Sequence, residues 1–109
     1  MNRRTEMKRK TLALIVVTAF VVSLAGLSMA ARSGKAVYES VCSACHATGV
    51  VGAPMFGTDD WKKLAREGID DLLEEALEGK NAMPPKGSCT ECSKEEIKAA
   101  IQYMLDSAK

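Results

Sequence analysis

The amino-acid sequence predicts an all-α domain, and three features of the chain indicate it. Apolar residues recur at intervals of three and four between positions 69 and 77, as on one face of a helix. A second apolar series follows Ser93 and Glu96, which have the spacing of a capping box at a helix start. No stretch alternates between apolar and polar residues as a half-buried strand does. We therefore expect helices that pack through their apolar faces.

Residues 1–30 have the layout of an export signal rather than of a folded domain. The first ten residues include a basic cluster of Arg3, Arg4, Lys8, Arg9 and Lys10. An apolar run then extends from Leu12 to Leu27, and Ser28-Met29-Ala30 supplies the small residues that a signal peptidase needs. We predict cleavage between Ala30 and Ala31.

A retained membrane anchor is the alternative for this segment. The 20 uncharged residues from Leu12 to Ala31 approach the length of a bilayer span. In both cases the basic end stays in the cytoplasm and the chain after residue 30 lies in the periplasm. The protein would contact the inner membrane only if the segment is retained.

The predicted domain, residues 31–109, is small and acidic. Its 79 residues include 10 Lys and Arg and 13 Asp and Glu, a formal charge of −3 before any cofactor is counted. It has no basic stripe and few aromatic residues, so nothing indicates nucleic-acid binding. A domain of this size buries a limited core and usually depends on a disulfide, a metal or a cofactor for stability.

Three helices can be assigned from the pattern of apolar residues. The first runs from about Ser33 to Cys42. The second contains the apolar series that starts at Ile69 and ends near Gly79, and the third begins at Ser93. Residues 47–58 are rich in glycine and small residues and are expected to form a loop. The residues expected to face the interior are Val37, Tyr38, Val41, Ile69, Leu72, Leu73, Ala76, Leu77, Ile97, Ile101, Met104 and Leu105.

The segment Cys42-Ser43-Ala44-Cys45-His46 has the form of a haem c attachment motif. Two intervening residues place both sulfur atoms along one edge of a porphyrin, where they can form thioethers with its two vinyl groups. His46, the only histidine in the chain, then lies beneath the iron as the proximal ligand. The motif predicts one covalently bound haem c.

Other uses of the cysteines fit the sequence less well. A zinc site would need all four cysteines, yet Cys89 begins 44 positions after Cys45, far from the roughly 15–20 residues of a zinc ribbon. A thioredoxin-like dithiol needs a surrounding βαβ pattern, which is missing here. A structural disulfide between Cys42 and Cys45 would leave the adjoining His46 without a role.

The identity of the second axial ligand separates an electron carrier from a catalytic or gas-binding haem protein. Met83 is the candidate, because it lies 37 residues after His46 in a loop whose Pro84 and Pro85 prevent a helix. Met55 is too close to His46 to reach the opposite face easily, and Met104 belongs to a helical stripe. The alternative for Met83 is a place in the core, the commoner use of methionine.

These motifs together resemble the class I cytochromes c, in particular the small bacterial cytochromes of the c-five type. The resemblance covers residues 33 to 107 and rests on residues 34–38, the Cys42 to Ala47 segment, Gly52-Ala53-Pro54, and Met83-Pro84-Pro85-Lys86-Gly87 followed by Cys89 and Cys92. It implies a single cytochrome c domain of about four helices around one haem, with His46 and Met83 as axial ligands. It also implies electron transfer rather than enzymatic activity.

The resemblance extends to three further features. It implies a disulfide between Cys89 and Cys92, as expected for such thiols in an oxidising compartment, with a redox-active dithiol as the alternative. It implies that the carbonyl of Pro54 accepts a hydrogen bond from His46, and that Trp61 donates its indole N–H to a haem propionate unless it is simply a core residue.

The functional prediction is a periplasmic one-electron carrier in a respiratory chain. Six-coordinate iron with His and Met ligands changes oxidation state with little rearrangement. Its partners would be transient redox proteins, such as an oxidase, a reductase or another cytochrome. A haem enzyme or gas sensor with a displaceable Met83 is the alternative.

Overall fold

The structure is a computed structural model that describes residues 3, 5–11 and 29–108. The chain divides into two units, Met1–Ala30 and Ala31–Lys109. In the first unit residues 5–11 are helical and exposed, while the apolar centre of the proposed export signal, residues 12–28, lies outside the described residues. Among the described helices, none combines the length and apolar character needed to cross a membrane.

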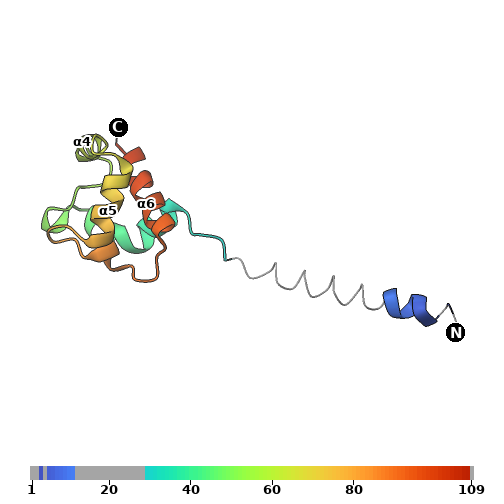
Figure 1. Cartoon of the computed structure of the whole chain (residues 1–109). Helices are drawn as coiled ribbons and strands as arrows, with labels where there is room; N and C mark the ends of the chain where they lie inside the picture. The colour runs from blue at the N-terminus through green and yellow to red at the C-terminus, as the bar shows by residue number, and fades with distance from the viewer. Residues whose placement is uncertain (1–2, 4, 12–28, 109) are drawn as a thin grey trace. The chain divides into compact units, whose positions relative to one another are not determined.

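The second unit is all-helical, as the sequence predicts (Figure 1). Its elements in chain order are the α-helix α2 (Gly34–Val37), the π-turn η1 (Tyr38–Cys42), α3 (Ser43–His46), the 3-10 turn η2 (Val50–Gly52), α4 (Asp60–Leu64), α5 (Ile69–Glu78), the 3-10 turn η3 (Pro85–Ser88) and α6 (Lys94–Asp106). Since α2, η1 and α3 are continuous, the unit has four main helical segments. Within the described residues the only β pairing is one bridge, between Lys80 and Met83.

The first helical segment is longer than the sequence indicated. Ser33 begins it as N-cap, with its side chain accepting a hydrogen bond from the Ala36 N–H at 3.2 Å. The predicted end near Cys42 is wrong by one turn, because α3 continues the helix to His46. The π-turn between them takes up one extra residue and so changes the direction in which the following residues face.

The first segment packs against α6 at very short range. A Cβ atom at Gly34 would overlap the backbone carbonyl of Ala99, so only glycine allows this approach. Val37, one turn later, is completely buried. The close contact joins the beginning and the end of the domain.

Helix α5 covers another side of α6. Leu72, Leu73 and Ala76 on its inner face are buried, whereas Ile69 and Leu77 are only partly buried at the edge. Gly68 and Gly79 flank the helix with φ angles of 90° and 86°, which lie in the left-handed region. The predicted helix and its ends are confirmed.

Helix α6 begins with the predicted capping box. The Ser93 hydroxyl accepts from the Glu96 N–H, and the Glu96 carboxylate accepts from the Ser93 N–H, each at 3.1 Å. Ile97, Ala100, Ile101 and Met104 are buried on one side of the helix. These residues form the centre of the core.

Candidate haem-attachment site

The two cysteines of the Cys42–His46 segment share one side of the first helical segment. Cys42 ends η1 and Cys45 lies three residues later in α3, a spacing that brings side chains together on a helix. Both are free thiols; Cys45 is exposed and Cys42 is partly buried. Burial raises the pKa of the Cys42 thiol above its ordinary value.

His46 follows at the end of the same helix and is 8% exposed. Its Nδ1 lies 2.8 Å from the carbonyl oxygen of Pro54. Because a carbonyl oxygen only accepts, Nδ1 carries a proton, and in the neutral imidazole Nε2 keeps the lone pair that a metal ligand needs. The backbone N–H of Phe56 donates to the His46 carbonyl at 2.7 Å and ties the loop back to the helix.

The loop between His46 and Pro54 turns through several left-handed residues. Gly49 and Gly52 have φ angles of 73° and 79°, and Val51 has a φ of 48°. A β-branched residue in this region is strained. The Val51 side chain is nevertheless 75% exposed, so burial of this side chain does not explain the conformation.

Trp61 lies in α4 against the imidazole. The centroids of the His46 and Trp61 rings are 5.7 Å apart, and Trp61 is 4% exposed. Its Nε1 is buried and has no hydrogen-bond partner among the described residues. An unpaired buried N–H is costly, which indicates an acceptor that protein atoms do not supply.

Met83 lies in the loop after α5. Lys80 and Met83 exchange two backbone hydrogen bonds, of 3.0 and 2.9 Å, which close a tight turn. A Cβ atom at Gly79 would lie 2.9 Å from the Met83 carbonyl oxygen and 3.0 Å from the Pro85 nitrogen, so the loop packs directly on the end of α5. The Met83 side chain is partly buried against the core.

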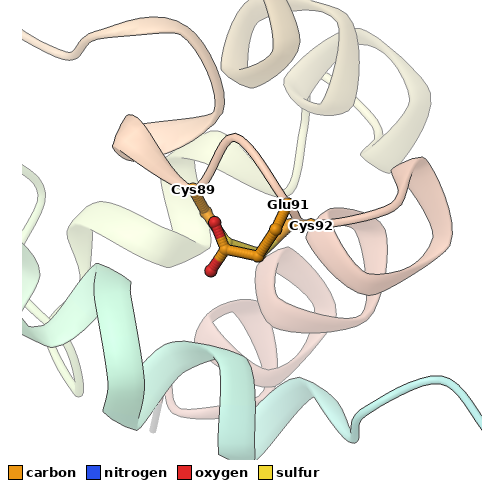
Figure 2. Close-up of side chains that lie close together, drawn as sticks. All are labelled: Cys89, Glu91 and Cys92. Atoms are coloured by element: carbon orange, nitrogen blue, oxygen red, sulfur yellow. A yellow bond between two sulfur atoms is a disulfide. The ribbon is translucent and has the colours of Figure 1, made fainter.

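Cys89 and Cys92 lie in the turn between η3 and α6, with their Cα atoms 5.4 Å apart and their sulfur atoms joined. Figure 2 shows Glu91 beside them, and its carboxylate and the two sulfur atoms lie within 4.8 Å of one another. Three such groups could hold a metal ion in principle. Joined sulfur atoms, however, have no thiolate to offer a metal.

Two structural features of this region were not predicted from the sequence. Arg32 contacts both Cys92 and Glu96, 60 and 64 residues further along the chain, and no local spacing signals such contacts. Tyr38, Phe56 and Tyr103 form an aromatic cluster with ring centroids 4.6 to 5.4 Å apart. Only Tyr38 was expected to face the interior and is buried; Phe56 and Tyr103 are partly buried and carried no such signal.

The fold and the site together define a small c-type cytochrome. Comparison with known proteins gives a more particular assignment. The family model described as "Cytochrome C oxidase, cbb3-type, subunit III" matches residues 29–104. Cytochrome c5 of Azotobacter vinelandii is 51% identical over 77 residues, which cover 68% of this chain and 93% of that protein.

Two solved structures agree in fold. The cytochrome in the "Crystal structure of electron transfer complex of nitrite reductase with cytochrome c" is 38% identical, with a TM-score of 0.68. A mono-heme ferrocytochrome c from Shewanella putrefaciens is 41% identical, with a TM-score of 0.62. In each case the match covers 74% of this chain and 100% of the other. The chain belongs to the class I monohaem cytochromes c, of the cytochrome c5 type, and is an electron-transfer protein rather than an enzyme.

The family implies a covalently bound haem c, and the residues of this chain fit that group. Two free thiols stand one helical turn apart, and the buried imidazole keeps Nε2 available. The unpaired indole N–H of Trp61 fits a charged acceptor such as a propionate. All these groups lie on the first helical segment and on α4.

Proposed function

We propose that this cytochrome is a periplasmic one-electron carrier of a respiratory chain, with His46 and Met83 as the axial ligands of its haem. Haem c, when bound, supplies an iron atom that gains and loses one electron. The chain itself supplies the groups that attach, orient and enclose it. The 2.8 Å contact between His46 Nδ1 and the Pro54 carbonyl is the observation that carries the proposal, because it aims a basic Nε2 away from the loop.

Met83 is proposed as the second ligand because its loop is held stiffly. Gly79, the Lys80–Met83 hydrogen bonds and the two prolines all limit the backbone around it. A weak thioether ligand benefits from such restraint, since little chain entropy is lost when the bond to iron forms. The Cys89–Cys92 disulfide closes the far end of the same segment.

Cys42 and Cys45 are proposed to form the two thioethers, and Trp61 to donate to a propionate. A hydrogen bond to a charged acceptor is worth roughly 1.5–3 kcal/mol. It would also satisfy the buried Nε1 that lacks a protein partner among the described residues.

The proposed location follows from the basic and apolar pattern of residues 1–30. Cleavage after Ala30 would release the domain into the periplasm, and retention of the segment would anchor it to the inner membrane. The mass of the protein recovered from the periplasmic and membrane fractions distinguishes the two: a periplasmic chain that begins at Ala31 supports cleavage, and a membrane-bound full-length chain contradicts it.

The partner class is proposed from the relatives. One similar cytochrome was solved in an electron-transfer complex with nitrite reductase, which makes a periplasmic reductase or oxidase a reasonable electron acceptor. Val50, Val51 and Met55 are exposed in the loop after the attachment segment. Apolar side chains there suit the small, short-lived contacts of redox proteins.

The ligands are tested with the whole chain, produced in a host that can attach haem c. The pyridine adduct of the denatured protein counts thioether-linked haem, and the far-red absorption band of the oxidised protein reports sulfur bound to ferric iron. We expect one haem per chain and a band that is lost in Met83→Ala but kept in the matched control Met55→Ala. A band that persists in Met83→Ala would exclude Met83 as the ligand.

A further inference from the structure

Arg32 covers the buried disulfide between η3 and α6. Cys89 and Cys92 are only 1% and 2% exposed. The Arg32 guanidinium lies against them, with Nη2 at 3.2 Å from Cys92 Sγ and 3.9 Å from Cys89 Sγ. The Arg32 side chain itself is 39% exposed, so together with the exposed Glu91 carboxylate it forms part of the surface beside the sulfur atoms.

Glu96 holds Arg32 in this position. Arg32 Nε and Nη2 donate to the two Glu96 carboxylate oxygens at 3.1 and 3.0 Å, and the Arg32 backbone N–H donates to Oε1 at 2.9 Å. The paired geometry fixes the plane of the guanidinium more firmly than a single ion pair would. The Ser93 N–H donates to the same carboxylate, so Glu96 links the Arg32 guanidinium to the capped start of α6.

The disulfide in turn closes a strained turn that follows Met83. Lys86, Gly87 and Ser88 have φ angles of 56°, 58° and 69°, three consecutive residues in the left-handed region. Non-glycine residues keep this conformation only where the surroundings impose it. Lys86 also donates from Nζ to the Cys92 carbonyl at 3.1 Å, a second link across the turn.

We propose that the Cys89–Cys92 disulfide restrains the Met83 loop, and that Arg32 shields this disulfide from exchange with dithiol reductants. A thiolate of the reductant attacks one sulfur, the S–S bond breaks, and the other cysteine leaves as a thiolate and takes up a proton. The second thiol of the reductant then displaces the first cysteine. Two electrons and two protons pass to Cys89 and Cys92, and the dithiol becomes a disulfide.

Shielding by Arg32 is tested by the rate at which dithiothreitol reduces the disulfide in the folded, haem-loaded protein. New thiols are trapped with iodoacetamide and counted by mass, a readout that does not depend on the iron. We expect Arg32→Gln to speed reduction about tenfold, because the gain in access of the attacking thiolate should exceed the loss of the cation that stabilises the leaving thiolate. Glu96→Gln should also speed it, and the double variant should react no faster than Arg32→Gln because both changes open the same cover.

Two control variants distinguish the loss of shielding by Arg32 from a general loss of stability. Lys35→Gln removes an exposed cation three residues away and should leave the rate unchanged. Ile101→Val weakens the buried core at a position in α6 nine residues after Cys92, and it should change the rate much less than Arg32→Gln. Equal reduction rates in Arg32→Gln and the original protein would overturn the proposed shielding. So would an acceleration in Ile101→Val as large as that in Arg32→Gln.

The proposal that the disulfide restrains the Met83 loop rests on the proposed Met83 ligation, and a separate measurement tests it. After thiol trapping, the iron is reoxidised with ferricyanide and the far-red band is measured; the double variant Cys89→Ser with Cys92→Ser provides a form without alkyl groups. We expect the band to fall at least threefold in both while helix content is kept, and a full band in both would overturn the fastening. A disulfide-intact protein without the band would instead refute Met83 ligation, and the trapping rates would still stand.

Discussion

Replacing Gly34 with alanine tests the closest approach between helices, because two effects of the change oppose each other. Helix propensity alone favours alanine over glycine by about 0.5–1 kcal/mol. The added Cβ, however, would overlap the Ala99 carbonyl and lie 3.1 Å from the Ala100 nitrogen. These are backbone atoms that cannot rotate away, so α2 and α6 must move apart.

The expected loss follows from what that movement disturbs. Overpacking of a tight core typically costs about 1–3 kcal/mol. Separation of the helices also loosens the packing of Val37, which is completely buried one turn later. We therefore expect Gly34→Ala to lower the free energy of unfolding by roughly 1–2 kcal/mol after the propensity gain is subtracted. For a domain of this size that corresponds to a fall in Tm of about 5–15 °C.

The assay is thermal and denaturant unfolding of the haem-loaded protein, followed by helix circular dichroism. Gly57→Ala is the control without steric overlap, since nothing lies within 4 Å of a Cβ added at Gly57. Its φ of 79° adds a backbone strain that Gly34 lacks, and even so it should lower stability by only about 1 kcal/mol. An unchanged or raised Tm in Gly34→Ala would mean that the helices are not held at this distance, and the packing argument would fail.

Three further predictions concern the charged cluster, the indole and the strained loop. Hydrogen bonds from Arg32 lower the pKa of Glu96 from 4.5 to about 2, so the stability it contributes is complete above pH 4.5 and is lost as the pH falls through 2. Unfolding measured across that window should be less pH-dependent in Glu96→Gln, and equal slopes would contradict the assignment. Trp61→Phe should destabilise the haem-loaded protein by about 1–3 kcal/mol in denaturant unfolding if a propionate accepts the indole N–H, whereas no loss would mean that none does. Val51→Gly should raise Tm by a few degrees, because relief of roughly 1–2 kcal/mol of left-handed strain exceeds the entropy cost of glycine, and a lower Tm would show that the Val51 side chain matters.

Helices with a clear apolar stripe were predictable from local sequence. The series from Ile69 to Leu77 and the glycine after it are enough to place α5, and Ser93 with Glu96 is enough to start α6. In contrast, α4 spans five residues, which is too short for a periodic pattern to stand out. The extension of the first segment to His46 depends on a π-turn, for which no reliable sequence signal exists.

The attachment segment was predictable for a similar reason, because its chemistry depends on neighbours in sequence. Cys42, Cys45 and His46 need only helical spacing to face one side. Arg32 and Glu96 are 64 residues apart, and their contact depends on how the terminal helices cross. The left-handed conformations of Val51, Lys86 and Ser88 likewise arise from tertiary constraint, since these residue types disfavour that region.

The two sides of the proposed haem site are therefore built in different ways. The His46 side combines one continuous helix with a loop that returns within ten residues, through contacts of His46 with Pro54 and Phe56. The Met83 side is a loop between Gly79 and Cys89, and its shape depends on close packing at one end and on a disulfide at the other. Because a loop held at its ends opens at lower free energy than a packed helix, the Met83 side is the part of the site whose geometry distant residues such as Arg32 can change.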